Sequence, residues 1–178
     1  MAFVRATIGA VVLVLAFLAG LWTGLGTGDG GSTPASGMLR ASEMPGPPTT
    51  VTTGGIRYRV LGWRCGILAV QGDHADWLAD GQYCRVRLRM TSADRYVHPF
   101  TAAEQVMVTV DGQTHPVNLN AVQIADQPTS TEARPGAVLE FDIWFDVPPD
   151  ARPAAVQLHG EDDAGGARID LVPTASPG

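Results

Sequence analysis

The side chains that could form a covalent bond within this chain are two cysteines, Cys65 and Cys84. Their spacing differs from the C-x-x-C of a redox or zinc motif, and no histidine is placed to complete a zinc site. Outside the cytoplasm thiols oxidise, and two such cysteines typically pair. The bridge would close a loop of about 20 residues and stabilise the fold by roughly 3 kcal/mol. We therefore predict a structural disulfide between Cys65 and Cys84.

An acidic segment lies between the two cysteines. Asp73, His74, Asp76 and Asp80 fall within a predicted loop, Gln71–Gly81, and their side chains could offer ligands to Ca²⁺. The spacing lacks the glycine and the distal glutamate of a known calcium loop, which favours a solvated acidic loop. The sequence predicts no cofactor and no metal site, and calcium binding by the segment stays an open alternative.

Catalysis by a Ser-His-Asp group would require a nucleophile beside a histidine. The histidines at positions 74, 98, 115 and 159 are scattered over four segments, and no G-x-S-x-G or comparable nucleophile context occurs. The sequence therefore favours a protein that is not an enzyme. An extracellular hydrolase is the remaining catalytic alternative, and it would need a nucleophile within about 3 Å of a histidine in the folded chain.

The strand Val138–Val147 is the element that the sequence defines best. Turn signals bound it on both sides, Pro135-Gly136 before it and Pro148-Pro149 after it. Within it, apolar and polar residues alternate with period two, which is typical of a strand with one face in a core and one facing water. The inward side chains that we expect are Leu139, Phe141, Ile143, Phe145 and Val147.

Other segments show the same alternation, with turn signals every 8 to 12 residues, and we expect seven or eight strands and no helix within the domain. This pattern predicts an all-β fold, an antiparallel β-sandwich. Gly62 suggests a bulge in the first long strand. The further strands expected are Ile56–Val70, Tyr83–Met90 with Cys84, Val86, Leu88 and Met90 inward, Val106–Val110, Gln113–Asn118 after an Asp-Gly turn, Ala154–Leu158, and a last one with Ile169 and Leu171 inward.

Arg85, Arg87 and Arg89 form a basic stripe on one predicted strand, and Glu140, Asp142 and Asp146 form an acidic stripe on another. Both stripes face outward. We predict that the two strands lie in one sheet, adjacent or one apart, so that opposite charges pair. Trp63, Trp77 and Trp144 are candidates for recognition; Trp144 faces outward and either packs under a loop or marks a contact surface. The possible interaction surface combines this tryptophan with the two stripes: Trp144, Glu140, Asp142, Asp146, Arg85, Arg87 and Arg89.

The N-terminus has the features of a targeting segment. One arginine, Arg5, precedes an uncharged run, Ala6–Leu25, which as a helix would span a hydrocarbon core of about 30 Å. Residues 1–26 are either an uncleaved signal anchor or a signal peptide. A flexible Gly/Ser/Pro linker is predicted over residues 27–48, and the globular domain over residues 49–174. The domain is expected outside the cell, attached to the cell membrane by a single pass, or alternatively secreted.

The charge of the chain limits its partners. The formal net charge is −6, which argues against a nucleic-acid binder, and all 12 basic residues are arginine. The charge is uneven, about +3 between Ile56 and Arg95 and about −9 between Glu104 and Asp170. Such an asymmetry marks either a partner surface or charge pairing within the fold.

Three segments carry a resemblance to a known family. They are the strand Tyr83–Met90 leading into a Thr-Ser turn, the hairpin at Val110-Asp111-Gly112, and the strand from Pro135-Gly136 to Phe145-x-Val147-Pro148. Together they resemble uncharacterised extracellular domains with a telokin-like, immunoglobulin-related β-sandwich, found in secreted or membrane-tethered proteins of Gram-positive bacteria. The family usually has Asn after the first of these strands, where this chain has Thr91-Ser92. The resemblance covers most of Thr49–Val172 and implies an immunoglobulin-like sandwich without known catalytic residues.

The sequence therefore predicts a membrane-tethered extracellular interaction domain. Its partners would be the membrane, through the N-terminal helix, and an unknown protein or cell-envelope component, with no nucleic acid. A structural accessory module of a cell-envelope complex is the alternative. The run Ala6–Leu25 has almost no polar side chains for contacts within the membrane, which favours the first interpretation.

Overall fold

A computed structural model describes residues 40, 42–73 and 75–172 of the 178-residue chain. All of these belong to the second of two compact units, Thr33–Gly178. The predicted targeting segment, residues 1–26, and the first part of the predicted linker lie outside the described residues. Within the described residues, no helix has both the length and the apolar character needed to span a membrane.

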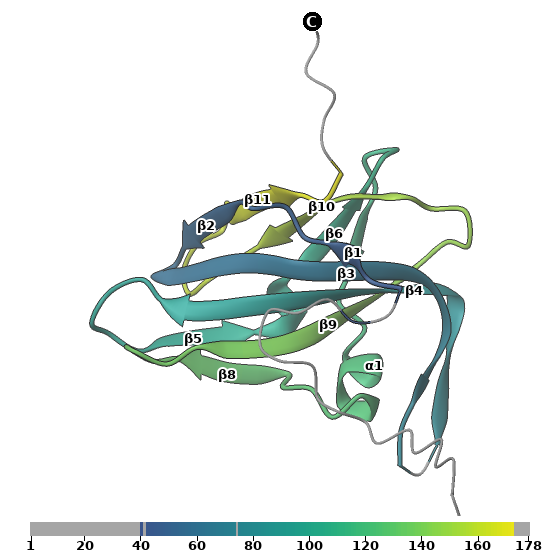
Figure 1. The fold of residues 1–178 in the computed structure, drawn as a ribbon, viewed down its shortest axis with the longest axis horizontal. Coiled ribbons are helices and arrows are strands. Elements are labelled where there is room, and N and C mark those ends of the chain that lie inside the picture. Colours follow the sequence, from purple (N-terminus) through teal and green to yellow (C-terminus); the bar gives the residue numbers. More distant parts are fainter. Residues whose placement is uncertain (1–39, 41, 74, 173–178) are drawn as a thin grey trace, which may run out of the picture. The chain divides into compact units, whose positions relative to one another are not determined.

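The larger sheet is antiparallel, and its strands run in the order β1-β3-β4-β9, with β2 also pairing with β3 (Figure 1). Two of these strands, β3 and β4, are long, with 16 and 17 residues. The strands are β1 (Met44–Pro45), β2 (Thr50–Thr53), β3 (Ile56–Gln71), β4 (Asp76–Ser92) and β9 (Leu139–Val147).

A second antiparallel sheet has the order β11-β10-β6-β7, and a third consists of β5 and β8. Two short helical segments join these strands. The remaining elements are β5 (His98–Thr101), η1 (Ala102–Glu104), β6 (Val106–Thr109), β7 (Thr114–Pro116), α1 (Leu119–Ile124), β8 (Ser130–Ala133), β10 (Pro153–Leu158) and β11 (Ala167–Asp170).

The core lies between the sheets, and the alternation of the strands places its residues. Phe141, Ile143, Phe145 and Val147 of β9 are buried and Leu139 is half-buried, as predicted. The predicted inward side chains of β4 are buried as well. They form one cluster with residues of the second sheet: Cys84, Val86, Leu88, Met90, Met107, Val156, Leu158 and Ile169. The antiparallel, almost helix-free architecture is consistent with an all-β sandwich.

The predicted loop Gln71–Gly81 is wrong, because β3 runs to Gln71 and β4 begins already at Asp76. The pairing of β4 with β9 ends at Gln82↔Val147. Beyond this pair, β3 and β4 continue as a two-stranded ribbon. We call residues 67–73 and 75–80 the arm. In Figure 1 the arm bends away from the other strands of the larger sheet. The predicted bulge near Gly62 is confirmed, since the register of β3 and β4 shifts between Val60 and Gly62.

Three other segments differ from the prediction. The segment expected to be a linker contains β1, and the domain therefore begins before residue 49. The segment expected to be a polar connection contains the helix α1, whose N-terminus is capped by the Asn118 side chain accepting a hydrogen bond from the N–H of Ala121. The same segment contains β8. Its partner β5 lies in another segment for which no strand was predicted.

Candidate interaction surface

The two charged stripes lie on neighbouring strands, which confirms the prediction that they share a sheet. In the register of β4 and β9, Arg87 stands opposite Asp142 and Arg89 opposite Glu140. The guanidinium group of Arg89 donates hydrogen bonds of 2.8 and 2.6 Å to Glu140. Part of the charge asymmetry in the sequence is therefore neutralised inside the fold.

The middle of this face is not open to solvent, contrary to the expectation for an outward stripe. Arg87 and Asp142 are only 2% and 4% exposed, and two residues N-terminal to β1 contact them: Glu43 contacts Arg87 and Arg40 contacts Asp142. Glu43 accepts a hydrogen bond of 2.8 Å from Arg87 and lies 3.6 Å from a guanidinium nitrogen of Arg85. The guanidinium of Arg40 lies 2.5 Å from the Asp142 carboxylate. We call these five residues the buried ionic cluster.

The five described residues of the buried ionic cluster carry unequal numbers of opposite charges. Three arginines face two carboxylates, so the formal sum is 3 − 2 = +1. Burial lowers the pKa of Arg85, and the Asp142 and Glu43 carboxylates oppose this change. Gly62 makes room for the cluster, since a Cβ atom there would stand 2.5 Å from the carboxyl carbon of Glu43.

Trp144 is buried. Of the two alternatives predicted for it, packing inside the domain therefore applies, and exposure on a contact surface does not. The Trp144 ring is 7% exposed, meets the Tyr83 ring edge-on at 6.1 Å, and lies 5.8 Å from the guanidinium carbon of Arg85. Burial, together with the nearby carboxylates of Asp146 and Asp80, raises the pKa of Tyr83 to about 12. Trp144, Arg87 and Asp142 are therefore not available to a partner in this structure.

Asp146, the last member of the predicted surface, has a structural contact at the base of the arm. Its carboxylate accepts hydrogen bonds from the backbone N–H groups of Asp80, at 2.9 Å, and Gly81, at 3.2 Å. These bonds cap the edge of β4 where its pairing with β9 ends. The contact helps to fix the direction in which the arm leaves the sheet.

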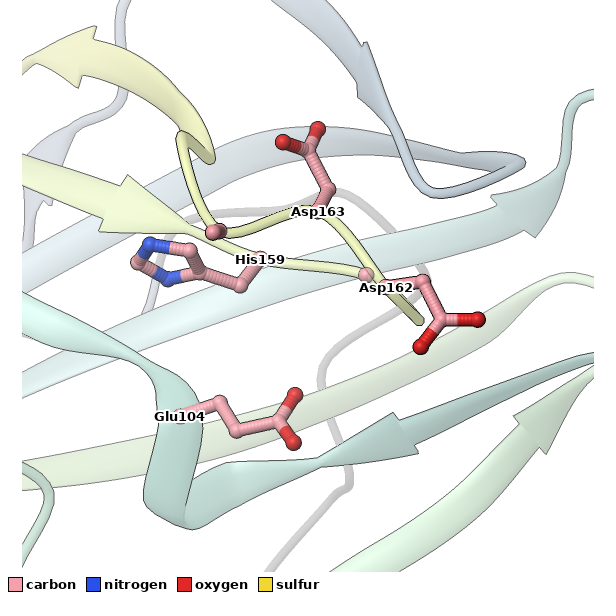
Figure 2. A pocket seen from close by; sticks show the side chains of 6 residues that line it. Glu104, His159, Asp162 and Asp163 are labelled. Atoms are coloured by element: carbon pink, nitrogen blue, oxygen red, sulfur yellow. The ribbon is translucent and has the colours of Figure 1, made fainter.

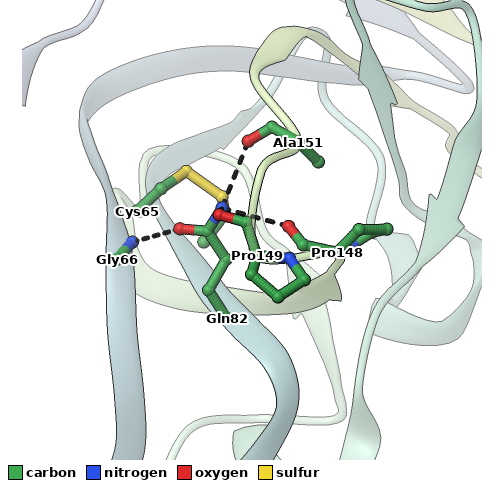
Figure 3. The surroundings of a disulfide bond; sticks show 7 residues. Cys65, Gly66, Gln82, Pro148, Pro149 and Ala151 are labelled. Carbon is green, nitrogen blue, oxygen red and sulfur yellow. Dashed lines mark hydrogen bonds between the residues drawn. A yellow bond between two sulfur atoms is a disulfide. The ribbon is translucent and has the colours of Figure 1, made fainter.

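The predicted disulfide is present, and Cys65 and Cys84 join β3 to β4 at the base of the arm. The register shifts here between Arg64 and Ile67, and Gly66 has a φ of 78°, a conformation that glycine adopts without strain. Figure 3 shows Gln82 beside the bridge. Its side-chain oxygen accepts the N–H of Gly66 at 2.8 Å, and its amide nitrogen donates to backbone carbonyls at 2.9 to 3.2 Å, those of Pro148, Pro149 and Ala151.

Replacing Gln82 with alanine is expected to lower the free energy of unfolding by about 1–3 kcal/mol, because several backbone groups lose their partner at once. Urea denaturation followed by tryptophan fluorescence measures the change. Gln157 offers a matched control, since its side chain makes a single exposed hydrogen bond to Gly165. A Gln82→Ala variant no less stable than Gln157→Ala would show that the Gln82 network does not hold the arm base.

One serine, one aspartate and one histidine lie together at the turn after β4, but not in a catalytic order. His98 pairs with Asp94 at 2.8 Å, while the Ser92 hydroxyl donates to the backbone carbonyls of Asp94 and Tyr96, both at 2.9 Å. In a catalytic triad the histidine must instead contact the serine hydroxyl. The arrangement of Ser92, Asp94 and His98 stabilises the turn.

His159 borders a hollow of about 470 Å³ that is also lined by Glu104, Asp162 and Asp163. Figure 2 shows the His159 ring pointing to one side of the loop and the Asp162 carboxylate to the other. The Tyr58 hydroxyl donates to the backbone carbonyl of His159 at 2.9 Å, so the loop is fixed to the large sheet. These side chains do not converge on a common point.

The candidate calcium ligands of the arm do not come together in one site either. Asp73 lies in the turn between the strands, Asp76 and Asp80 lie on β4, and His74 is outside the described residues. Over the ranges that the structure describes, no group of three His, Cys, Asp or Glu side chains could hold a metal ion. Calcium binding by this segment stays an untested alternative.

The carboxylate of Asp163 accepts hydrogen bonds from the Thr53 hydroxyl and from the N–H groups of Gly165 and Gly166. These bonds lower the pKa of Asp163, and the bond from Thr53 has the largest effect. A depressed pKa in the folded state adds stability above the unfolded pKa, and this stability is lost as the pH falls through the folded pKa. We expect Thr53→Val to raise the pKa of Asp163 towards its ordinary value and to weaken this acid-side loss.

NMR titration of the side-chain carboxyl carbons measures this change directly. Asp111 is an internal control, because its pKa is lowered by a hydrogen bond from Thr109 at the other end of the domain. An unchanged Asp163 pKa in Thr53→Val, or an equal rise for Asp111, would contradict the assignment of the effect to the Thr53 hydroxyl.

The arm presents large apolar side chains to solvent. Leu68 and Leu78 are 71% and 72% exposed, and Trp77 is 41% exposed. Val70, which stands opposite Trp77, is buried against the core and holds the arm to the domain. Trp77 and Leu78 follow each other on β4 and Leu68 lies on the paired strand, so large exposed apolar side chains gather on this one ribbon. Gathered exposed apolar side chains mark interaction sites more often than scattered ones. The arm is thus the best-supported candidate surface among the described residues.

Sequence reasoning found one member of this surface and missed the others. Trp77 was a candidate for recognition by residue type alone. Leu68 was expected inside a continuous strand, and Leu78 inside a polar loop. A usable signal was the apolar triplet Trp77-Leu78-Ala79 in the middle of an otherwise acidic segment.

No protein-family profile and no curated protein matches the sequence. Among solved structures, a conserved hypothetical protein from Bacillus anthracis is similar with a TM-score of 0.49 and 11% identity, covering 75% of this chain and 100% of that one. The secreted protein MPT63 from Mycobacterium tuberculosis is similar with a TM-score of 0.37 and 17% identity, covering 65% of this chain and 86% of that one. Both are bacterial proteins, and with TM-scores below 0.5 neither supports an inference about function.

Proposed function

We propose that this protein is a non-catalytic interaction domain, held outside the cytoplasm, that binds a protein partner through the arm. The observation that carries the proposal is the exposure of Leu68, Trp77 and Leu78 on one projecting ribbon. Leaving such side chains in water costs free energy that a partner recovers by covering them. A rigid base supports the ribbon, formed by the disulfide, Gln82 and Asp146.

The location outside the cytoplasm is supported by the pairing of Cys65 with Cys84, since disulfides persist in oxidising compartments. The apolar run Ala6–Leu25 would supply the export signal and, if uncleaved, the membrane anchor. We assign the sandwich to the immunoglobulin-like class on the basis of its antiparallel sheets and the family resemblance of the sequence.

A non-catalytic role is supported by what the candidate catalytic groups do. Ser92 and His98 are both engaged in the turn after β4, and the polar groups beside His159 diverge. An activity screen against ester, peptide and glycoside substrates would contradict the proposal if it found hydrolysis that is lost in His98→Ala or His159→Ala.

Site-specific cross-linking tests the arm as the contact surface. A photoreactive benzoylphenylalanine replaces Leu78 in the full-length chain, and cells making this chain are irradiated before the envelope proteins are analysed. Val110 is the matched control position, because it is 70% exposed and lies on a different hairpin. We expect a discrete protein adduct from position 78 and none from position 110.

The same adduct should weaken when Leu68→Ser is added to the chain, since that change removes a neighbouring contact without touching the core. Equal adducts from positions 78 and 110 would overturn the proposal, and so would the absence of any protein adduct from position 78. A change of Val110 to serine is expected to leave the adduct at position 78 unaltered.

A further inference from the structure

The outer edge of β3 along the arm has no strand beside it. On that side β2 pairs with Ile56–Arg59 and β1 with Gly62–Trp63, and from Arg64 to Gln71 no described strand follows. An unpaired edge presents N–H and C=O groups that another strand can use. We propose that the arm binds an extended segment of a second protein, which adds to this edge and carries a basic side chain to the acidic tip.

This inference rests on the proposed function and specifies its partner. The edge is bent by two register shifts, between Arg64 and Ile67 and between Ile67 and Ala69, and it then pairs regularly with β4 up to Gln71. An added strand would thus pair with the regular part of the arm, Ala69–Gln71, with Leu68 directly before it. In this binding mode backbone hydrogen bonds give affinity, and alternate side chains give specificity.

The exposed apolar side chains define what the added segment must bring. Leu68 is a large apolar side chain of β3 that is 71% exposed along this edge, and Trp77 and Leu78 lie on the paired strand. Because side chains of a strand alternate between two faces, every second side chain of an added strand lies on the same face as Leu68. Apolar or β-branched residues at those positions would cover it.

The charge of the arm sets the other requirement. Residues 67–80 contain Asp73, Asp76 and Asp80 and neither arginine nor lysine. Asp73 and Asp126 line a hollow of about 410 Å³ between the tip and α1. Within the described part of the chain, none of these four carboxylates takes part in an ion pair. A lysine or arginine of the partner would fit there, with its stem on the apolar surface and its charge at the tip.

Two other occupants fit this chemistry less well. In a second copy of this chain, the same three aspartates would approach each other across an arm-to-arm contact, which like charges disfavour. An anionic lipid surface would be repelled by the same carboxylates, because membrane binding of this kind relies on basic residues. A basic, extended protein segment meets both the apolar and the acidic part of the arm.

Selection from random peptides tests the proposal. Displayed peptides of about eight residues, which span roughly 25 Å when extended, are selected against the full-length chain in mild detergent. We expect the bound peptides to alternate apolar and other residues and to be enriched in arginine or lysine. The dissociation constant of the best peptide, measured by fluorescence anisotropy, should rise about tenfold for Asp73→Asn combined with Asp76→Asn.

Matched variants separate the parts of the proposal. Asp150→Asn removes an exposed carboxylate elsewhere and should leave the affinity unchanged. A peptide that is N-methylated at alternate residues loses N–H donors on one edge only, so one of the two methylation patterns should abolish binding. Both patterns binding as well as the parent peptide would overturn strand addition, and selected peptides without basic enrichment would overturn the charge requirement.

Three further results would also overturn the inference. They are a failure to select any peptide whose binding is lost in Leu68→Ser, binding of the chain to phosphatidylglycerol vesicles that is lost in Leu68→Ser, and a dimer in sedimentation that is lost in the same variant. The cross-linking at position 78 judges the proposed function separately. A protein adduct there together with failed strand addition would leave the arm as a contact surface and exclude this mode of binding.

Discussion

Replacing Glu43 with alanine is expected to lower the free energy of unfolding by about 3–5 kcal/mol, because it removes a buried carboxylate that contacts two arginines. Glu43 is fully covered and contacts both Arg87 and Arg85, and its removal changes the formal charge of the buried ionic cluster from +1 to +2. Neither guanidinium can lose its proton to relieve this charge. Urea denaturation of the purified chain, followed by tryptophan fluorescence, measures the effect.

A surface ion pair provides the control for this prediction. Glu132 and Arg134 also form a close pair, at 2.7 Å, but both side chains are exposed. Glu132→Ala should therefore cost about 1 kcal/mol or less. If Glu43→Ala were as mild as Glu132→Ala, residues 40–46 would not be docked on the sheet in solution. Glu43→Gln, which keeps the shape and removes the charge, should fall between the two.

Loss of the Cys65–Cys84 bridge is expected to lower the free energy of unfolding by roughly 3 kcal/mol, through the greater freedom of the unfolded chain. The two residues are separated by 19 positions, so the bridge closes a loop of moderate length. The double variant Cys65→Ala with Cys84→Ala tests this, with intact mass showing the deficit of two hydrogens in the parent protein. Because the bridge lies at the base of the arm, hydrogen exchange of residues 67–80 should also accelerate.

Reduction of the parent protein separates the cross-link from the packing of the sulfur atoms. Cys84 is fully buried, so the alanine variant also loses core contacts. Reduced parent protein keeps those atoms and should still lose most of the stability. If reduction left the unfolding midpoint unchanged, the bridge would be dispensable, and the instability of the double variant would be due to the core alone.

The sequence was sufficient for the elements whose pattern is local. The alternation of β9 placed Phe141, Ile143 and Phe145 in the core, and the charges on β4 and β9 correctly predicted that these strands share a sheet. Period two specifies which face of a strand is inward, and complementary stripes favour pairing. Each of these patterns can be read within its own strand, even where, as for the charges, two strands are then compared.

The features that the sequence did not show depend on distant segments. Residues 40–46 have the composition of a linker, and their docking requires Arg87, which is 44 positions away from Glu43. Asp76–Asp80 is rich in residues that avoid strands, and its pairing with the end of β3 imposes the strand. The helix α1 was not predicted, because its six residues are too few to show a helical period.

The path of residues 40–46 has a mechanical consequence. The chain passes from Arg40 beside β9 to Glu43 beside β4 and reaches the outer edge of the large sheet in β1. A pull from the N-terminal side would therefore load the ionic contacts of Glu43 and the two-residue pairing of β1 before it loads the apolar core. The contacts of Glu43 and the pairing of β1 thus form a release element in series with the core, which would yield under tension while the core stays folded.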